Sequence, residues 1–85
     1  MELEKVEDAL RKMVTSLDKG IRLETVDEEE DAYRLVLGKG NHSERGVVDR
    51  PLLEEYLAAG KNLPEIKKVL GKVISKLNRL AQRRY

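Results

Sequence analysis

Apolar residues recur at three- and four-residue steps in the first part of the chain, and this spacing predicts an amphipathic helix over residues 2–18. The residues on its apolar face are Leu3, Val6, Leu10, Met13, Val14 and Leu17. Several acidic residues occupy its first turns, where the positive end of the helix dipole stabilises them. Gly20 follows as a stop signal.

The period of the pattern changes to two after Gly20. Apolar and polar residues alternate over Ile21–Val26 and again over Ala32–Gly38, which is typical of strands with one buried face. The acidic segment DEEED, residues 27–31, separates the two, so we expect an antiparallel hairpin with this segment as its loop. In that register Val26 lies opposite Ala32, and Glu24 forms a cross-strand charge pair with Arg34.

The segment GKGNHSERG, residues 38–46, is expected to form a glycine-bounded loop. The VVD sequence that follows allows a short third strand near residues 46–49. A helix then starts near Asp49, with Asp49 as its N-cap and Pro51 in its first turn, and ends at Gly60. A last helix from Leu63 to Arg84 has one apolar face: Leu63, Ile66, Leu70, Val73, Leu77 and Leu80.

This order predicts a single α+β domain over residues 1–85: a helix, an antiparallel β-hairpin, then two helices packed on one face of the small sheet. The alternative is an essentially helical domain with a peripheral hairpin. Because the chain has no Cys, neither disulfides nor thiolate metal sites are available to it. No apolar run approaches the length of a bilayer span, and the acidic start does not resemble a signal peptide. We therefore expect a cytoplasmic protein with no membrane partner.

The net charge of +1 hides a strong asymmetry along the chain. Residues 61–85 contain eight Lys and Arg but a single acid, Glu65, whereas acids outnumber bases over residues 1–60. A helical wheel places five cations in one stripe beside the apolar face of the last helix: Lys68, Lys72, Lys76, Arg79 and Arg83. Cations one turn apart on a rigid helix suit contacts with nucleic-acid phosphates. The alternative is a solvated stripe, or one neutralised by the acids of residues 27–31 and of the first helix.

The apolar spacing of the last helix also predicts a contact surface for another protein. At 1.5 Å per residue the helix is about 33 Å long, whereas the expected strands span only about 20–24 Å. The overhanging end, with Leu77, Leu80 and Ala81, therefore requires a covering surface, and Gly71 and Ser75 would permit close helix approach. We expect a small interaction domain that binds a protein partner or forms a homodimer, with nucleic-acid binding through the stripe as the alternative.

The predicted loop offers a second candidate anion site, formed by Lys39, His42 and Arg45. Its glycines do not have the spacing of a phosphate-binding loop, and one His without Cys provides too few ligands for zinc. The acids of residues 27–31 lack the spacing of a calcium loop. Because the sequence shows no paired catalytic groups, we expect no enzymatic activity, no cofactor and no metal.

Overall fold

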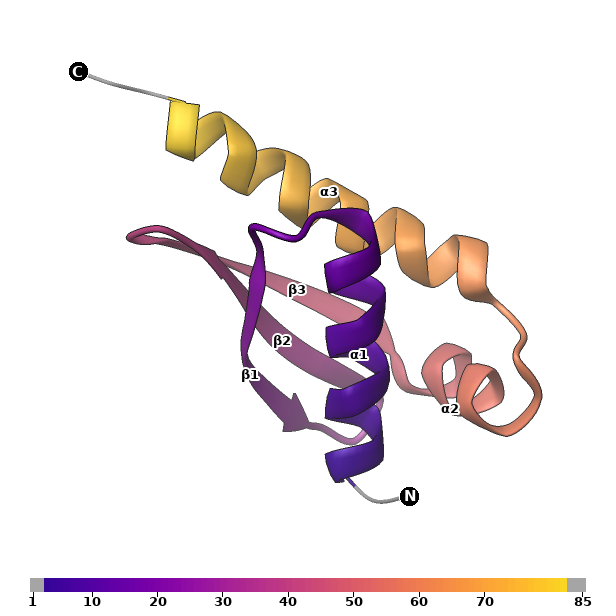
Figure 1. Cartoon of the computed structure of the whole chain (residues 1–85). Coiled ribbons are helices and arrows are strands. Elements are labelled where there is room, and N and C mark those ends of the chain that lie inside the picture. The colour runs from indigo at the N-terminus through magenta and orange to yellow at the C-terminus, as the bar shows by residue number, and fades with distance from the viewer. Residues whose placement is uncertain (1–2, 83–85) are drawn as a thin grey trace.

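The structure is a computed structural model that describes residues 3–82. Its elements are α1 (Leu3–Leu17), β1 (Arg22–Glu28), β2 (Ala32–Lys39), β3 (His42–Asp49), α2 (Arg50–Ala59) and α3 (Leu63–Gln82). The strands form one antiparallel sheet in the order β1-β2-β3, with α1 and α3 packed beside one another against it (Figure 1). The predicted α+β class and element order are therefore confirmed, including the third strand.

One face of the sheet carries the core. Val26, Leu35, Leu37 and Tyr33 are buried on that face, and Val48 is buried opposite Tyr33. They form one cluster with the apolar faces of the helices, and these helical residues are Val6, Leu10, Met13, Val14, Leu53, Ile66, Leu70, Val73, Ile74 and Leu77. The opposite face of the sheet carries exposed side chains such as Val47. The helices thus cover a single face, as predicted for this two-layer arrangement.

The register of the β1–β2 hairpin differs from the predicted one. The strands continue through Asp27 and Glu28, so that Glu28 lies opposite Tyr33 and Val26 opposite Leu35. An irregularity between Leu23 and Thr25 inserts one extra residue into β1. This β-bulge turns Val26 to the core and leaves Thr25 exposed, a pattern that a regular strand cannot produce. The predicted pairing of Val26 with Ala32, and of Glu24 with Arg34, is therefore wrong.

The predicted loop over residues 38–46 is also wrong, because nearly all of this segment is strand. The final pair of the β2–β3 ladder is Lys39 with His42, which leaves a two-residue turn, Gly40–Asn41. Gly40 has φ +59°, and glycine at the first turn position suits the type II′ turn of tight hairpins. The eight residues of β3 make it as long as β2, so the sheet extends further than predicted.

The two helical boundaries in the second half agree with the sequence prediction. Asp49 precedes α2 at the N-cap position, although its side chain makes no capping hydrogen bond. Gly60 ends α2 in the left-handed conformation, with φ +71°, and its N–H donates to the Tyr56 carbonyl. The Asn62 side chain donates to the Leu52 carbonyl and to Glu55, and so joins the start of α3 to α2.

A glycine in β3 fixes how closely α3 approaches the sheet. A Cβ atom at Gly46 would lie 2.8 Å from Val73 Cγ2 and 3.3 Å from Leu35 Cδ1. Because carbons in contact are normally 3.5–4.0 Å apart, any side chain at position 46 would push α3 away from β3 at this point. Further along, Lys76 lies near Glu44 and Asn78 near Lys39. The C-terminal half of α3 therefore runs toward the turn of the β2–β3 hairpin.

Candidate functional site

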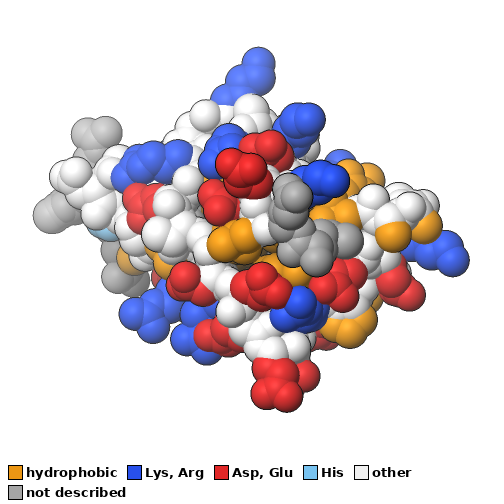
Figure 2. All heavy atoms as spheres, turned by 90° about the horizontal axis from the view of Figure 1, so that it is seen from below, with side chains coloured by type: hydrophobic (Ala, Val, Ile, Leu, Met, Phe, Trp, Pro, Cys, Tyr) orange, Lys and Arg blue, Asp and Glu red, His pale blue; other side chains and the backbone are white. Residues whose placement is uncertain are grey.

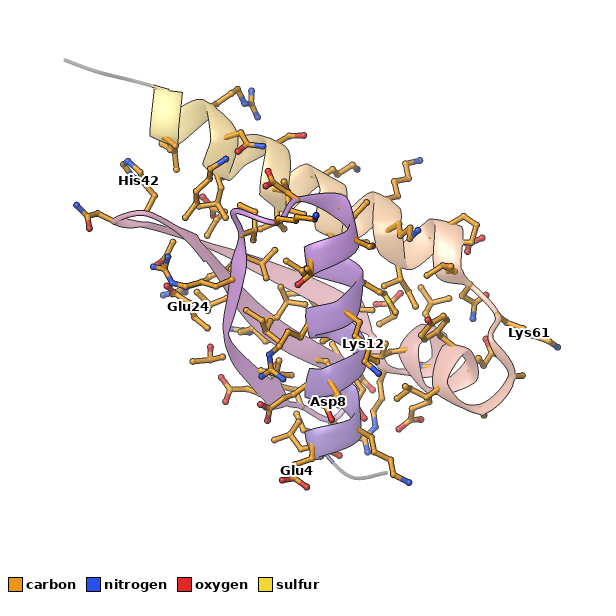
Figure 3. The ribbon with its side chains drawn as sticks, viewed as in Figure 1. Glu4, Asp8, Lys12, Glu24, His42 and Lys61 are labelled. Atoms are coloured by element: carbon orange, nitrogen blue, oxygen red, sulfur yellow. The ribbon has the colours of Figure 1, made fainter. Side chains whose placement is uncertain are left out.

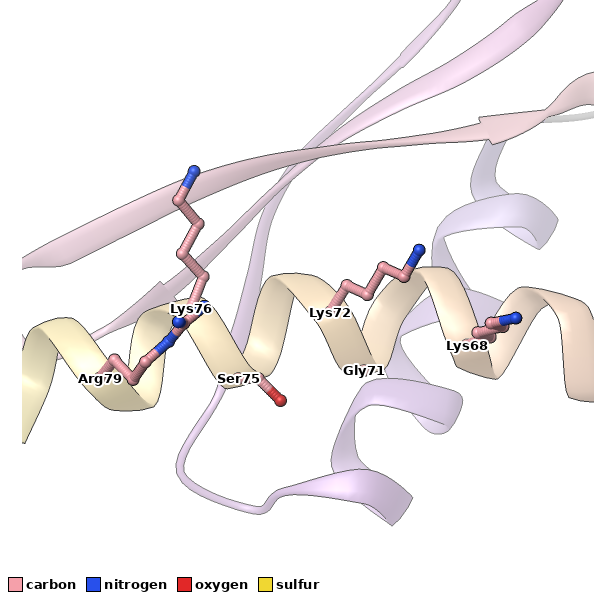
Figure 4. A pocket seen from close by; sticks show the side chains of 6 residues that line it. All are labelled: Lys68, Gly71, Lys72, Ser75, Lys76 and Arg79. Carbon is pink, nitrogen blue, oxygen red and sulfur yellow. The ribbon is translucent and has the colours of Figure 1, made fainter.

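The described part of the predicted basic stripe consists of Lys68, Lys72, Lys76 and Arg79, all of them exposed on α3. Arg83, the fifth predicted member, lies outside the described residues. From the first to the last of the four the helix rises about 16 Å, at 1.5 Å per residue. Together with Gly71 and Ser75 they line an open, shallow pocket on the surface of α3 (Figure 4).

Within residues 3–82 the stripe has little internal charge compensation. Lys76 Nζ lies 3.7 Å from Glu44 Oε2, and the lysine side chain remains 60% exposed. Glu44 is half-buried, but a pair at that separation with an exposed lysine contributes little to stability. No described carboxylate lies within 4.0 Å of Lys68, Lys72 or Arg79. Most of the positive charge of the stripe is thus available to an external anion.

The acids predicted to neutralise the stripe form their ion pairs elsewhere. Glu28 lies 2.6 Å from Arg50, the first residue of α2, and Glu29 lies 3.4 Å from Arg34 on β2. On α1, Asp8 pairs with Arg11 across one helical turn at 3.0 Å. On the face seen from below, acidic side chains are interspersed with Lys and Arg (Figure 2). Neutralisation by these acids is therefore not observed in the described residues, whereas a solvated stripe remains a competing interpretation.

A polar cluster holds the C-terminal half of α3 to the rest of the domain. Lys39 at the end of β2 donates a hydrogen bond to Asn78 Oδ1 of α3. Asn78 Nδ2 in turn donates to Asp18, just after α1, at 3.2 Å. The backbone N–H of Gly20 donates to Asp18 and, with this Asn78 bond, lowers the pKa of the Asp18 carboxyl. The cluster links three elements and so fixes the orientation in which the stripe is presented.

The three residues of the second candidate anion site are placed differently by the β2–β3 hairpin. Lys39 points toward α3, where it contacts Asn78 and lies 3.7 Å from the Asp18 carboxylate. His42 lies at the tip of the β2–β3 hairpin, opposite Lys39 in the register (Figure 3). Arg45 pairs with Val36 three residues further along β3, so the alternation of the strand directs it to the other face. The register thus keeps Lys39 and His42 adjacent but separates Arg45 from them, and the shared anion site stays a prediction.

The predicted protein interface at the end of α3 is also changed by the structure. Leu77 has no exposed surface, because the longer β2–β3 hairpin and the rest of the core cover it. Leu80 is half-buried and Ala81 is exposed. Leu77 thus belongs to the core and is not available to a partner. The overhang of α3 is smaller than predicted because residues 38–46 extend the sheet and do not form a loop.

Other kinds of site find no support among residues 3–82. No group of three or more His, Asp or Glu side chains in this range is placed to hold a metal ion. None of the helices in the same range combines the length and apolar character needed to cross a bilayer. What the stripe offers chemically is a row of hydrogen-bond donors with fixed positive charge, suited to an extended anion.

Searches of protein-family models, of curated proteins and of solved structures find no significant match to this chain. The interpretation of the stripe therefore depends on its own geometry and charge.

Proposed function

We propose that the protein binds the phosphate backbone of double-stranded nucleic acid through the basic stripe of α3. One observation carries this proposal: Lys68, Lys72 and Arg79 have no carboxylate within 4.0 Å in the described part of the chain. Their charge is arrayed along a rigid 20-residue helix. Neutralising phosphates along such a row releases condensed counterions, which drives binding whatever the base sequence.

The shape of the stripe favours contact with one strand of backbone over insertion into a groove. A helix that enters the major groove lies between two rows of phosphates and is best served by cations on both of its flanks. Here the exposed cations form a single row beside Gly71 and Ser75, and Lys67 on the other side of that surface is half-buried. No aromatic side chain lines the described pocket, so stacking on single-stranded bases has no support there. Duplex binding without base readout fits this arrangement.

The test is fluorescence anisotropy with labelled duplex DNA, duplex RNA and single-stranded RNA at several salt concentrations. Each phosphate contact on duplex DNA contributes about −0.9 to the slope of log affinity against log salt. The four described cations therefore predict a slope near −3.6, and engagement of Arg83 as well would bring it to about −4.5. We expect both duplexes to bind more tightly than the single strand.

Matched charge-reversal variants distinguish binding through the stripe from a general effect of net charge on binding. The variant Lys68→Glu, Lys72→Glu, Arg79→Glu should lose duplex binding. The control Lys5→Glu, Lys12→Glu, Lys19→Glu makes the same change in net charge at exposed positions at or near α1, and it should retain binding. Equal loss in both variants, or in neither, would show that the stripe is not the binding surface. Tighter binding of the single strand would contradict the choice of duplex.

Binding of a protein partner or self-association, the function first expected from the sequence, stays a prediction, but its expected contact surface is smaller in the structure. Of its three proposed contact residues, Leu77 is buried in the core. Among the described residues, the large hydrophobic side chains that remain exposed are Leu17 at the end of α1 and Val47 on the uncovered face of the sheet. A salt-insensitive dimer in sedimentation experiments, weakened by Leu80→Asp, would restore self-association as the better proposal.

A further inference from the structure

Gly71 lies in the middle of α3, where the fold gives no reason for a glycine. Glycine is the least favourable residue in a helix interior apart from proline. A Cβ atom at this position would meet nothing within 4 Å, and its backbone is not in the left-handed region. The other glycines contrast with it: Gly46 is required by contact with Val73, and Gly60 by its positive φ. A methyl group at position 71 would therefore meet no steric obstacle in the folded protein.

Gly71 lies among the cations of the basic stripe. Lys68 lies one turn before it, Lys72 follows it, and Ser75 lies one turn after it, all lining the same shallow pocket. Gly71 and Ser75 leave the helix surface low, beside the long side chains of the lysines (Figure 4). An anion can approach the helix more closely here than at any position where a longer side chain stands. A longer side chain at position 71 would occupy this low surface, and its Cβ atom would meet no other part of the protein within 4 Å.

We propose that a phosphate of the bound duplex crosses α3 at Gly71, the point where the ligand comes closest to the helix. Ser75 Oγ donates a hydrogen bond to that phosphate, and Lys68 and Lys72 supply its charge compensation. This inference rests on the proposed function and adds a position and an orientation to it. It also makes Gly71 and Ser75 ligand contacts, although neither residue carries charge.

The test uses Gly71→Leu and Ser75→Ala in the full chain, with the salt titrations described above. Leucine is a better helix former than glycine, so Gly71→Leu should raise the temperature of unfolding. It should nevertheless weaken duplex binding about tenfold, the effect of losing one charge-assisted contact. The magnitude of the salt slope should fall by about 0.9, corresponding to one phosphate. Ser75→Ala should weaken binding by about fivefold, because it removes one neutral hydrogen-bond donor.

Thr15→Leu is the matched control, because it adds the same side chain at an exposed position on α1. It should leave both the affinity and the salt slope unchanged. If reversal of Lys68, Lys72 and Arg79 abolishes binding but Gly71→Leu has no effect, this inference is wrong and the proposed function stands. If the wild-type protein does not bind duplexes, or binds them independently of the stripe, both are overturned.

Discussion

The close approach of α3 to β3 predicts a specific response to the substitution Gly46→Ala. The added Cβ would lie 2.8 Å from Val73 Cγ2, about 0.7 Å or more inside the normal contact distance. Neither atom is at the end of a long, adaptable side chain, so α3 must move away from the sheet to relieve the clash. Val73 itself is nearly fully buried, which leaves it little freedom to change rotamer.

The expected cost follows from two opposing effects. Overpacking in a core typically costs about 1–3 kcal/mol of the free energy of unfolding. Replacing glycine by alanine at a compatible backbone conformation returns about 0.4–1 kcal/mol by restricting the unfolded chain. The net destabilisation should therefore be about 1–2 kcal/mol. For a domain of this size, each kcal/mol lowers the midpoint of thermal unfolding by about 4–8 °C.

Urea denaturation followed by circular dichroism measures this cost. A double-mutant cycle tests whether the cost arises from the contact between position 46 and Val73. Val73→Ala removes the methyl group that clashes, leaving Leu35 Cδ1 as the nearest atom at 3.3 Å. In that background Gly46→Ala should cost at least about 1 kcal/mol less than in the wild type. An equal cost in both backgrounds would refute the reasoning, since the destabilisation would then arise elsewhere than at the contact of α3 with β3.

Two pH-dependent effects also follow from the structure. Hydrogen bonds from the Gly20 N–H and from Asn78 lower the pKa of the Asp18 carboxyl below its ordinary value of 3.8. The ionised carboxylate therefore stabilises the fold above pH 3.8, and this stabilisation is lost as the pH falls through the lowered pKa. Asp18→Asn should be less stable than the wild type at neutral pH, with a difference that shrinks in acid unfolding below about pH 4. Burial raises the pKa of the Tyr33 hydroxyl above its ordinary value of 10.0, so the folded protein should lose stability as the pH rises past that value. An ultraviolet titration should show one late-ionising tyrosine that Tyr33→Phe removes; persistence of that component in the variant would exclude Tyr33 as its source.

Much of the fold follows from local sequence patterns. The apolar stripes of α1 and α3 have a helical period, and Gly60 marks the end of α2 as predicted. The bulge in β1 could not be predicted from alternation alone. It depends on packing in the folded core, which buries Val26 and leaves Thr25 exposed. For β3 a signal was present: Gly40–Asn41 is a dipeptide of the two-residue hairpin type, but the polar residues after it obscured the strand.

The candidate site was predictable in part. Helical spacing placed Lys68, Lys72, Lys76 and Arg79 on one side of α3, and the structure has all four exposed there. The partners of the surrounding charges were not predictable, because they depend on tertiary contacts between distant segments. Glu28 pairs with Arg50, and Glu44 lies beside Lys76, only once β3 is in place. The sequence likewise could not show that a Cβ atom at position 71 has no neighbours, because this depends on how the rest of the protein packs around α3.

The uneven distribution of charge along the chain has a consequence for the kinetics of encounter. Residues 1–60 contain nine Lys and Arg against fifteen Asp and Glu, a balance of −6, whereas residues 61–85 have eight against one, a balance of +7. The protein therefore combines almost no net charge with a local positive field along the exposed cations of α3. In the field of a polyanion we expect this uneven charge to produce a torque that turns α3 forward. Productive collisions would thus be selected by orientation before contact, and added salt would slow association by screening that torque.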